Sequence, residues 1–422
     1  MNNPRIFLGT TEIAGYYTGL HKGFSELGLE VSYYFQKPHK FGYSRETVFE
    51  RWLQKLSARY RAASKRSRRT RIDLLCVPVL ERWLVNSIID RHDIFIFGFM
   101  TSLDGILKGG PRLRDLKRLK SLGKTVICVF HGSDVRPVWL NGSFHAKEPA
   151  ELLKLGTKKL DWLHEIEEYA DVIVSHPTMA TLQNRPYAQY LSVGIPMPHI
   201  KAEQSNEMER KSDAFQIVHA PSNPEAKGTD EIKAAIAKLR SEGYKIDLSL
   251  LINVPNSKVL EALRNADLLI DQVFSDTPMA HLATEAATQG CPTVVCGYDL
   301  KALQRIVPAK DWPPTIIGEP DELYDCIKWA LDHSAERLEI GRAAHAFVSE
   351  RWRPEQVAKN FLRLAREGVP KEWLIDPNQK RFWGGYGMTL DQRDALINNI
   401  VAQLGEEVLG LPYEVTIPLP RP

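Results

Sequence analysis

A short polar stretch directly follows an apolar run in the first half of the chain. Residues 126–130 are apolar, and His131, Gly132, Ser133 and Asp134 come next. A core strand gains nothing from such side chains, whereas ligands of α/β sheets bind at the carboxyl ends of parallel strands. Histidine can move a proton, and Ser133 or Asp134 can bind a ligand hydroxyl or cap the next segment. The stretch predicts one wall of an active site; a buried histidine bonded to the backbone is the structural alternative.

A lysine stands at the expected start of a helix in the second half. Lys227 and Gly228 follow a strand and a loop and precede a helical pattern over residues 230–242. A helix N-terminus offers free N–H groups and the positive end of a dipole, to which the lysine adds a full charge. This combination predicts a diphosphate site, with a solvated loop lysine beside a helix cap as the alternative.

The basic side chains are concentrated in one place. Residues 59–71 hold seven basic side chains and no acid, including Arg66, Arg68, Arg69 and Arg71, while the whole chain has a formal charge of only +3. Each basic side chain contributes about 1 kcal/mol near an anionic membrane. The run predicts a contact with an anionic membrane surface, or else a solvated loop. A nucleic-acid-binding face would be spread more widely, so no nucleic-acid partner is expected.

These residues require a sheet to position them. Apolar runs at 6–8, 29–35, 93–97, 125–130 and 171–174 alternate with helical spacing, first at 16–27. Such alternation is typical of a parallel sheet with helices on both faces.

The pattern restarts after the polar segment 201–213. Strands are expected at 215–220, 246–252, 267–271 and 292–296, with helices at 230–242, 258–265 and 283–289 between them. The sequence therefore predicts two tandem Rossmann-like, doubly wound α/β domains facing a cleft, with a C-terminal helical extension. The expected boundaries are 1–200 for the first domain, 201–213 for a linker, 214–345 for the second domain, and 346–422 for helices and a tail that return to the first domain.

Composition narrows the class of protein. Of 422 residues, 43% are hydrophobic and 25% are charged, as in ordinary globular proteins. No apolar run approaches the roughly 18 residues of a membrane-spanning helix, and no signal peptide is recognisable. The five cysteines are widely spaced, which favours free thiols over disulfides or zinc. We expect a cytoplasmic protein, held at the inner face of the membrane if the basic run binds there.

Two segments of the second domain carry a resemblance. The stretch HAPSNPEAKGTDEI and the later ATEAATQG are similar to the donor-binding half of nucleotide-sugar glycosyltransferases with the GT-B fold, in particular the retaining group with a Glu-x7-Glu motif. In the first domain, EIAGYYTGLHKGFSELG and FHGSDVRP are compatible with the same family. The resemblance covers about residues 4–365 and leaves out the tail.

The resemblance assigns donor-binding residues. It implies that Lys227, with Gly228, binds the phosphates of the donor, that Glu285 binds the ribose hydroxyls, and that the loop at Val254 lies against the base. A carboxylate such as Glu285 accepts two charge-assisted hydrogen bonds; a first-turn glutamate favoured by the helix dipole is the alternative.

The chain departs from this family at two points. The first glutamate of the motif is replaced by Thr277, with Asp276 beside it, and prolines occupy the loop before Lys227 where the family usually has an arginine. Thr277 therefore predicts a roomier, less anionic pocket at the donor sugar. Asp276 is a candidate substitute carboxylate, but a shift of one residue can turn its side chain away from the sugar.

The resemblance also assigns residues of the first domain. It implies that His131 is catalytic and faces the transferred sugar, and that Glu12, Gly15 and Asp134 lie where acceptor or phosphate approaches. Close helix packing is an equal alternative for the glycine, and a capping role is favoured for Asp134.

Together these observations predict a glycosyltransferase, hexosyltransferase-like and retaining. It would move a sugar from a nucleotide-diphosphate donor to a carbohydrate or lipid-linked glycan acceptor in surface polysaccharide or glycoconjugate biosynthesis. No Asp-x-Asp motif is present, so we expect no metal and no cofactor beyond the donor substrate. The alternative is a catalytically degenerate GT-B protein that serves as a partner subunit or sugar-binding module.

Overall fold

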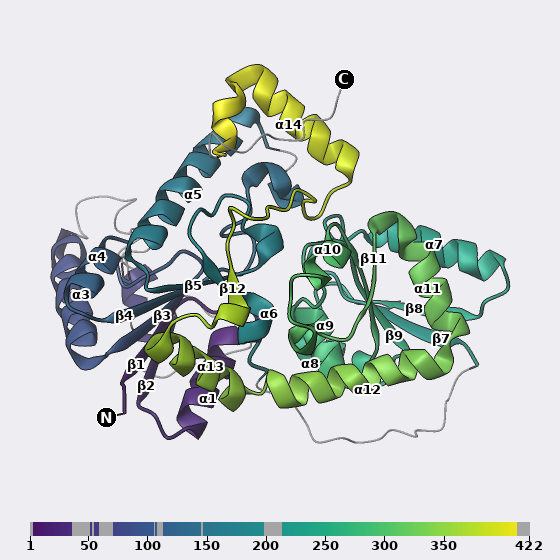
Figure 1. Ribbon diagram of the computed structural model, residues 1–422, viewed down its shortest axis with the longest axis horizontal. Coiled ribbons are helices and arrows are strands. Elements are labelled where there is room, and N and C mark those ends of the chain that lie inside the picture. The colour runs from purple at the N-terminus through teal and green to yellow at the C-terminus, as the bar shows by residue number, and fades with distance from the viewer. Residues whose placement is uncertain are drawn as a thin grey trace.

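Two lobes, each built on a largely parallel sheet, lie side by side (Figure 1). The computed structural model describes residues 3–35, 51–52, 55–58, 71–104, 106–107, 113–144, 147–197 and 213–411. The expected linker 201–213 lies outside these residues except for Asp213, and the basic run lies outside them except for the backbone of Arg71.

The first sheet has seven strands in the order β12-β6-β5-β4-β3-β1-β2, all parallel except for the pairing of β12 with β6. Successive residues of a strand contribute to different hydrophobic cores, because their side chains point to opposite faces of the sheet. Phe95 and Phe97 join one core, and Ile94 and Ile96 join the other. The strands are β1 (Ile6–Thr10), β2 (Val31–Phe35), β3 (Ile94–Gly98), β4 (Thr125–Val129), β5 (Val172–Ser175), β6 (Tyr187–Gln189) and β12 (Leu374–Ile375).

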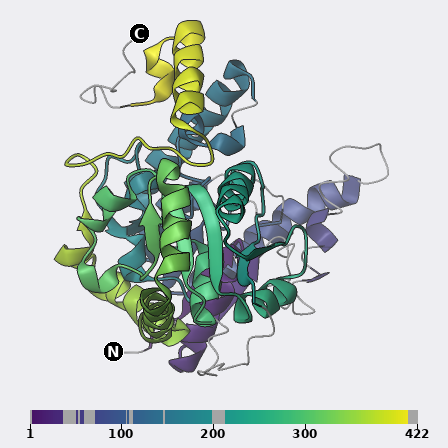
Figure 2. The ribbon, with the colours of Figure 1, turned by 90° about the vertical axis from the view of Figure 1, so that its right-hand side faces the viewer.

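Helices cover both faces of the first sheet. They are α1 (Tyr16–Glu26), α3 (Arg71–Arg91), α4 (Arg114–Ser121), α5 (Pro149–Tyr169) and the short α6 (Tyr190–Val193). Helix α1 lies on one face, and α3, α4 and α5 lie on the other (Figure 1). Helix α3 projects from the side of the molecule (Figure 2).

The second sheet is wholly parallel, in the order β11-β10-β9-β7-β8. Its strands are β7 (Phe215–His219), β8 (Ile246–Leu250), β9 (Leu268–Ser275), β10 (Thr293–Gly297) and β11 (Ile316–Gly318). Its helices are α7 (Thr229–Ser241), α8 (Asn256–Arg264), α9 (His281–Thr288), α10 (Leu300–Gln304), α11 (Leu323–Asp332) and α12 (Ser334–Arg351). The strand order reverses between β7 and β9, the position where doubly wound sheets bind ligands.

The C-terminal residues return to the first domain. Helix α13 (Pro354–Glu367) packs against α1, β12 extends the first sheet, and α14 (Leu390–Leu404) lies on α5 (Figure 1). The boundary expected at residue 345 is wrong, because α12 continues through it to Arg351. An amphipathic pattern does not reveal which domain a helix covers, so the sequence could not place this boundary.

The predicted fold class is confirmed: two Rossmann-like domains stand in tandem and the C-terminal extension is largely helical. The expected strands and helices are present with small shifts at their ends. The short strands β6, β11 and β12 were not anticipated, because two or three residues carry no periodic signal.

Candidate functional site

A cavity of about 400 Å³ lies at the carboxyl edge of the second sheet and reaches the first domain. Its wall combines the loops after β7 and β8 with the start of α8 and α9, and Ala14 closes it from the loop after β1. Three predicted donor-binding residues, Lys227, Val254 and Glu285, line it together. The other lining residues are Ala220, Pro221, Ser222, Leu251, Asn253, Asn256, Val259, Asp271, Ala280, His281 and Leu282.

Lys227 points its ammonium toward the end of β9. It donates to the side-chain oxygen of Gln272 and lies 3.8 Å from Asp271 Oδ1. Asp271 is 1% exposed, and neither of its carboxylate oxygens accepts a hydrogen bond from the described residues. A buried carboxylate is costly unless it is paired, so Asp271 holds the lysine in place at the cavity.

Gly228 begins α7 in the left-handed region, with φ of 72°. A Cβ at this position would stand 2.5 Å from the side chain of Val273. Only glycine therefore lets the loop approach β9 closely enough to bring Lys227 to the cavity.

Glu285 is buried one turn into α9, with 5% of its surface exposed. Its Oε1 accepts a hydrogen bond of 2.7 Å from Asn256 Nδ2 and lies 3.6 Å from His281 Nε2. The carboxylate is thus oriented by groups from α8 and α9. Asn256 and His281 were not singled out from the sequence, since an asparagine at a helix start is an ordinary cap.

The loop after β8 brings backbone to the cavity at Val254. The preceding Asn253 has a positive φ of 56°, which turns the chain there. Backbone groups recognise a flat ring without characteristic side chains, so this loop carries little sequence signal.

Thr277 and Asp276 follow β9 at the interface between the domains, outside the cavity lining. Thr277 is 5% exposed, and its hydroxyl has no hydrogen-bond partner among the described residues. Asp276, the candidate substitute for the missing glutamate, directs its carboxylate to Arg136 of the first domain.

His131 follows β4 inside a cluster of tyrosines. Its Nε2 lies 2.9 Å from the hydroxyl of Tyr17, and its Nδ1 lies 3.2 Å from that of Tyr190. Burial, with a smaller effect of nearby His281, lowers the pKa of His131 to about 3. The imidazole is therefore neutral at physiological pH, and both of its nitrogens lie within hydrogen-bonding distance of tyrosine hydroxyls.

Asp134 caps the turn that follows His131. Its carboxylate accepts backbone N–H bonds from His131, Gly132 and Val135 at 2.7–3.1 Å. Burial raises the pKa of Asp134, although these bonds act in the opposite sense. This geometry is that of the structural alternative, in which the carboxylate organises the loop.

Glu12 and Gly15 shape the loop after β1. Glu12 accepts bonds from the backbone of Gly15 and Thr18 at 3.1 and 3.0 Å and from the hydroxyl of Tyr33 at 2.8 Å. Gly15 has φ of 88° and precedes α1. Both residues thus fix the loop that presents Ala14 to the cavity, while neither Glu12 nor Gly15 lines it.

The predicted membrane residues Arg66, Arg68 and Arg69 lie outside the described residues, as does the side chain of Arg71. Within the described parts of the chain, no helix is long and apolar enough to cross a bilayer. In the same parts, no group of three or more His, Cys, Asp or Glu side chains is arranged to hold a metal ion.

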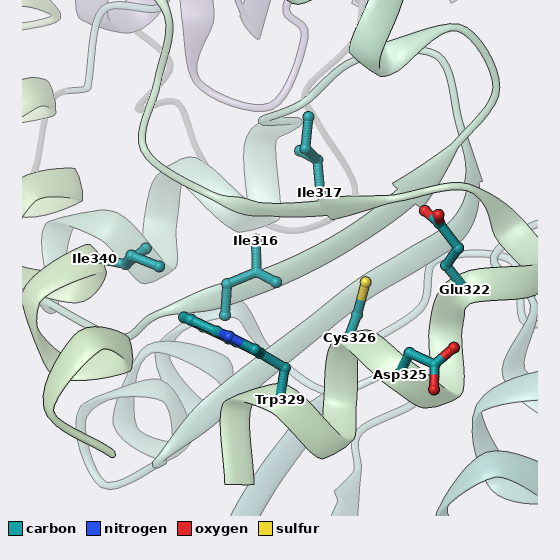
Figure 3. Close-up of a pocket in the computed structure, with 7 residues that line it drawn as sticks. All are labelled: Ile316, Ile317, Glu322, Asp325, Cys326, Trp329 and Ile340. Carbon is teal, nitrogen blue, oxygen red and sulfur yellow. The ribbon is translucent and has the colours of Figure 1, made fainter. Parts of the chain in front are cut away.

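A second cavity, of about 410 Å³, lies at the outer edge of the second sheet (Figure 3). Trp329 and Cys326 point into it from α11, and Ile316 faces them from β11 (Figure 3). It contains none of the predicted site residues and no cation, so it does not suit a diphosphate.

The fold and the position of the first cavity define the class of the molecule. Two tandem Rossmann-like domains enclosing a site at the carboxyl edge of the second sheet constitute the GT-B fold.

Solved structures share this architecture at low sequence identity. OtsA without ligand matches with a TM-score of 0.51 and 12% identity, over 87% of this chain and 100% of its own. The glycosyltransferase SnogD of Streptomyces nogalater matches with a TM-score of 0.42 and 12% identity, over 86% of this chain and 100% of its own. HepE of Anabaena in complex with UDP matches with a TM-score of 0.45 and 11% identity, over 85% of this chain and 98% of its own. No family model and no curated protein matches the sequence.

Proposed function

We propose that the protein is a glycosyltransferase that takes its sugar from a nucleotide-diphosphate donor bound in the 400 Å³ cavity. The observation that carries the proposal is the meeting of Lys227, Glu285 and the backbone at Val254 in one cavity. A cation, a carboxylate and a backbone edge suit a diphosphate, a ribose and a base, in that order.

The chemistry follows from the charge that develops when the sugar leaves the diphosphate. The bond between the anomeric carbon and the phosphate oxygen breaks, and negative charge grows on the leaving group. Lys227, whose side chain lines the cavity, would stabilise that charge as a cation already in place, the usual source of electrostatic catalysis. His131 does not line the cavity, and both of its ring nitrogens face tyrosine hydroxyls, so a bond from the imidazole to the sugar would require it to exchange one of these partners. We take over retention of configuration from the resemblance as part of the proposal.

The acceptor in this proposal is a carbohydrate or a lipid-linked glycan of surface polysaccharide or glycoconjugate assembly. The basic run would bring the first domain to an anionic membrane where such acceptors lie. On the neighbouring helix α3, Val79 and Trp83 are 71% and 64% exposed, one turn apart. Tryptophan prefers the membrane interface, which supports this placement.

The test is a thermal-shift screen of nucleotide sugars followed by a transfer assay with the best ligand. A ligand at a hundred times its dissociation constant adds about 2.7 kcal/mol of stability. Stabilisation by one nucleotide-sugar class, with release of nucleoside diphosphate in the presence of acceptor, is the expected result. Binding without turnover on any acceptor would instead indicate the non-catalytic sugar-binding module.

A further inference from the structure

Four side chains from three parts of the chain form a cluster between the domains. Arg136 lies beyond β4 in the first domain, while Asp276 and Lys227 belong to the second. Arg136 contacts Asp276 through Nε and a terminal nitrogen at 2.7 and 2.6 Å, and both side chains are 6% exposed. Tyr386 of the C-terminal extension completes the cluster: its ring centre lies 4.0 Å from the guanidinium carbon of Arg136 and 6.0 Å from Nζ of Lys227.

The backbone of Tyr386 is fixed by both domains. Its N–H donates to the carbonyl of Leu140 and its carbonyl accepts from Gly142, at 3.0 and 2.7 Å. The next residue, Gly387, donates to the carbonyl of Phe274 in β9 at 3.0 Å. Aromatic faces attract cations, so a ring held in this way defines where both cations stand.

The pairing of Arg136 with Asp276 involves both positions at which the sequence departs from the Glu-x7-Glu family, because it supplies an arginine and uses the carboxylate beside Thr277. The loop before Lys227 has prolines in place of an arginine, and a carboxylate stands at Asp276 beside Thr277 rather than at position 277. Asp276 draws an arginine from the opposite domain toward Lys227. A buried ion pair is rarely retained for stability alone, because desolvation offsets much of the attraction.

Lys227 remains a cation in these surroundings. Burial opposes its charge, but the nearby Tyr386 and two carboxylates outweigh that effect, and its pKa is raised above the ordinary value. Arg136 lowers the pKa of Lys227, because it is a nearby charge of the same sign. Each of the two cations faces a buried carboxylate, Asp271 for Lys227 and Asp276 for Arg136, so an anion with two charged centres would bind by competing with these carboxylates for the cations.

We propose that Arg136 is the second cation for the donor diphosphate and replaces the arginine that the loop before Lys227 lacks, with Tyr386 as a positioning residue for both cations. In the free protein Asp276 holds Arg136 ready. This inference rests on the proposed function and adds to it that the diphosphate is bound from both domains, so that the donor bridges the cleft.

The test compares nucleoside diphosphates with the matching monophosphates by calorimetry, using UDP, GDP, ADP and dTDP to find the preferred base. The ratio of the two dissociation constants measures how much the second phosphate contributes to binding. Arg136→Gln is expected to reduce the preference for the diphosphate roughly ten- to a hundredfold, the loss typical of a charged hydrogen bond. Tyr386→Phe keeps the ring and is expected to retain the preference, whereas Tyr386→Ala is expected to reduce it.

Asp276→Asn is the matched control, because it breaks the same ion pair but leaves the arginine in place. It is expected to reduce the diphosphate preference by less than Arg136→Gln does, because a charged arginine remains near Lys227, while lowering the melting temperature about as much. Equal loss of preference in both variants would show that the pair only holds the domains together, and would overturn the inference.

Should Arg136→Gln fail to fold, Arg136→Lys takes its place. The shorter amine keeps a charge for Asp276, and it is expected to reduce the preference severalfold; an unchanged ratio would overturn the inference. A wild-type protein that binds no nucleoside diphosphate would instead refute the proposed function itself.

Discussion

A single substitution at Glu285 can test whether its carboxylate binds the ribose of the donor or the transferred sugar. Its carboxylate is buried at the cavity and oriented by Asn256. Glu285→Ala is expected to weaken a nucleoside diphosphate and the corresponding nucleotide sugar by the same factor, because the ribose is common to both. The loss should reach about 1.5–3 kcal/mol, as for hydrogen bonds to charged groups. Paired calorimetric titrations measure it.

Asn256→Ala serves as the control for this prediction. It removes a donor to Glu285 but leaves the carboxylate, so it should weaken both ligands less than Glu285→Ala does. If substitution of Glu285 weakened binding of the nucleotide sugar alone, Glu285 would be assigned to the transferred sugar and not to the ribose.

His131 makes a prediction about pH. Burial, assisted by His281, lowers its pKa to about 3, whereas an exposed histidine of the unfolded chain titrates near about 6.5. Between these values the unfolded state binds more protons, so stability is complete above about pH 6.5 and is lost as pH falls toward 3. His176 has the same lowered pKa, for the same main reason of burial.

His131→Gln should therefore flatten the fall in unfolding free energy between pH 7 and 4.5, measured by urea denaturation. The same substitution should lower turnover more than donor affinity if the imidazole bonds to the transferring sugar. An unchanged pH slope would show that His131 titrates normally and is not enclosed by the tyrosines.

At the scale of elements, the sequence predicted most strands and helices of both sheets, because long apolar runs and helical spacing are local signals. It also placed Lys227 just before one helix and Glu285 in the first turns of another, and both side chains line one cavity. It could not predict the pairing of Arg136 with Asp276, since two residues 140 positions apart meet only through the packing of the domains. The role of Tyr386 was missed for the same reason, whereas Asn256 was missed because an asparagine at a helix start is an ordinary cap.

The turn after β4 depends on one side chain. Asp134 accepts three backbone N–H groups, and Asp134→Ala would leave them without a partner. The expected cost is about 1–3 kcal/mol of unfolding free energy, typical of unsatisfied buried donors. Asp134→Asn, which keeps an acceptor, should cost less. Denaturant unfolding compares the two; full stability with a raised acceptor KM would assign Asp134 to the acceptor site instead.

At the scale of the molecule, the first domain should bind anionic membranes through its basic run. Replacing Arg66, Arg68, Arg69 and Arg71 with glutamine is expected to reduce binding to anionic vesicles and to leave binding to neutral vesicles unchanged. The difference should fade as salt is added, because screening acts over about 8 Å at physiological ionic strength. Vesicle co-sedimentation measures it, and equal binding at low salt would refute the membrane contact.

Trp83→Ser tests the neighbouring helix in the same assay. An inserted tryptophan contributes apolar contact that salt does not screen, so this variant should lose binding at high as well as low salt. A variant that behaves as wild type would limit the contact to the basic run.

The return of α13 to the first domain has a consequence for synthesis on the ribosome. Phe361 and Val357 of α13 share a core with Leu20 and Phe24 of α1, and β12 closes the edge of the first sheet beside β6. The first domain is therefore made first but completed last. At the usual rate of translation its apolar face waits roughly ten to thirty seconds for α13 to emerge. A gene shortened before residue 354 should yield a protein that aggregates, although the second domain is intact, because the missing cover belongs to the first.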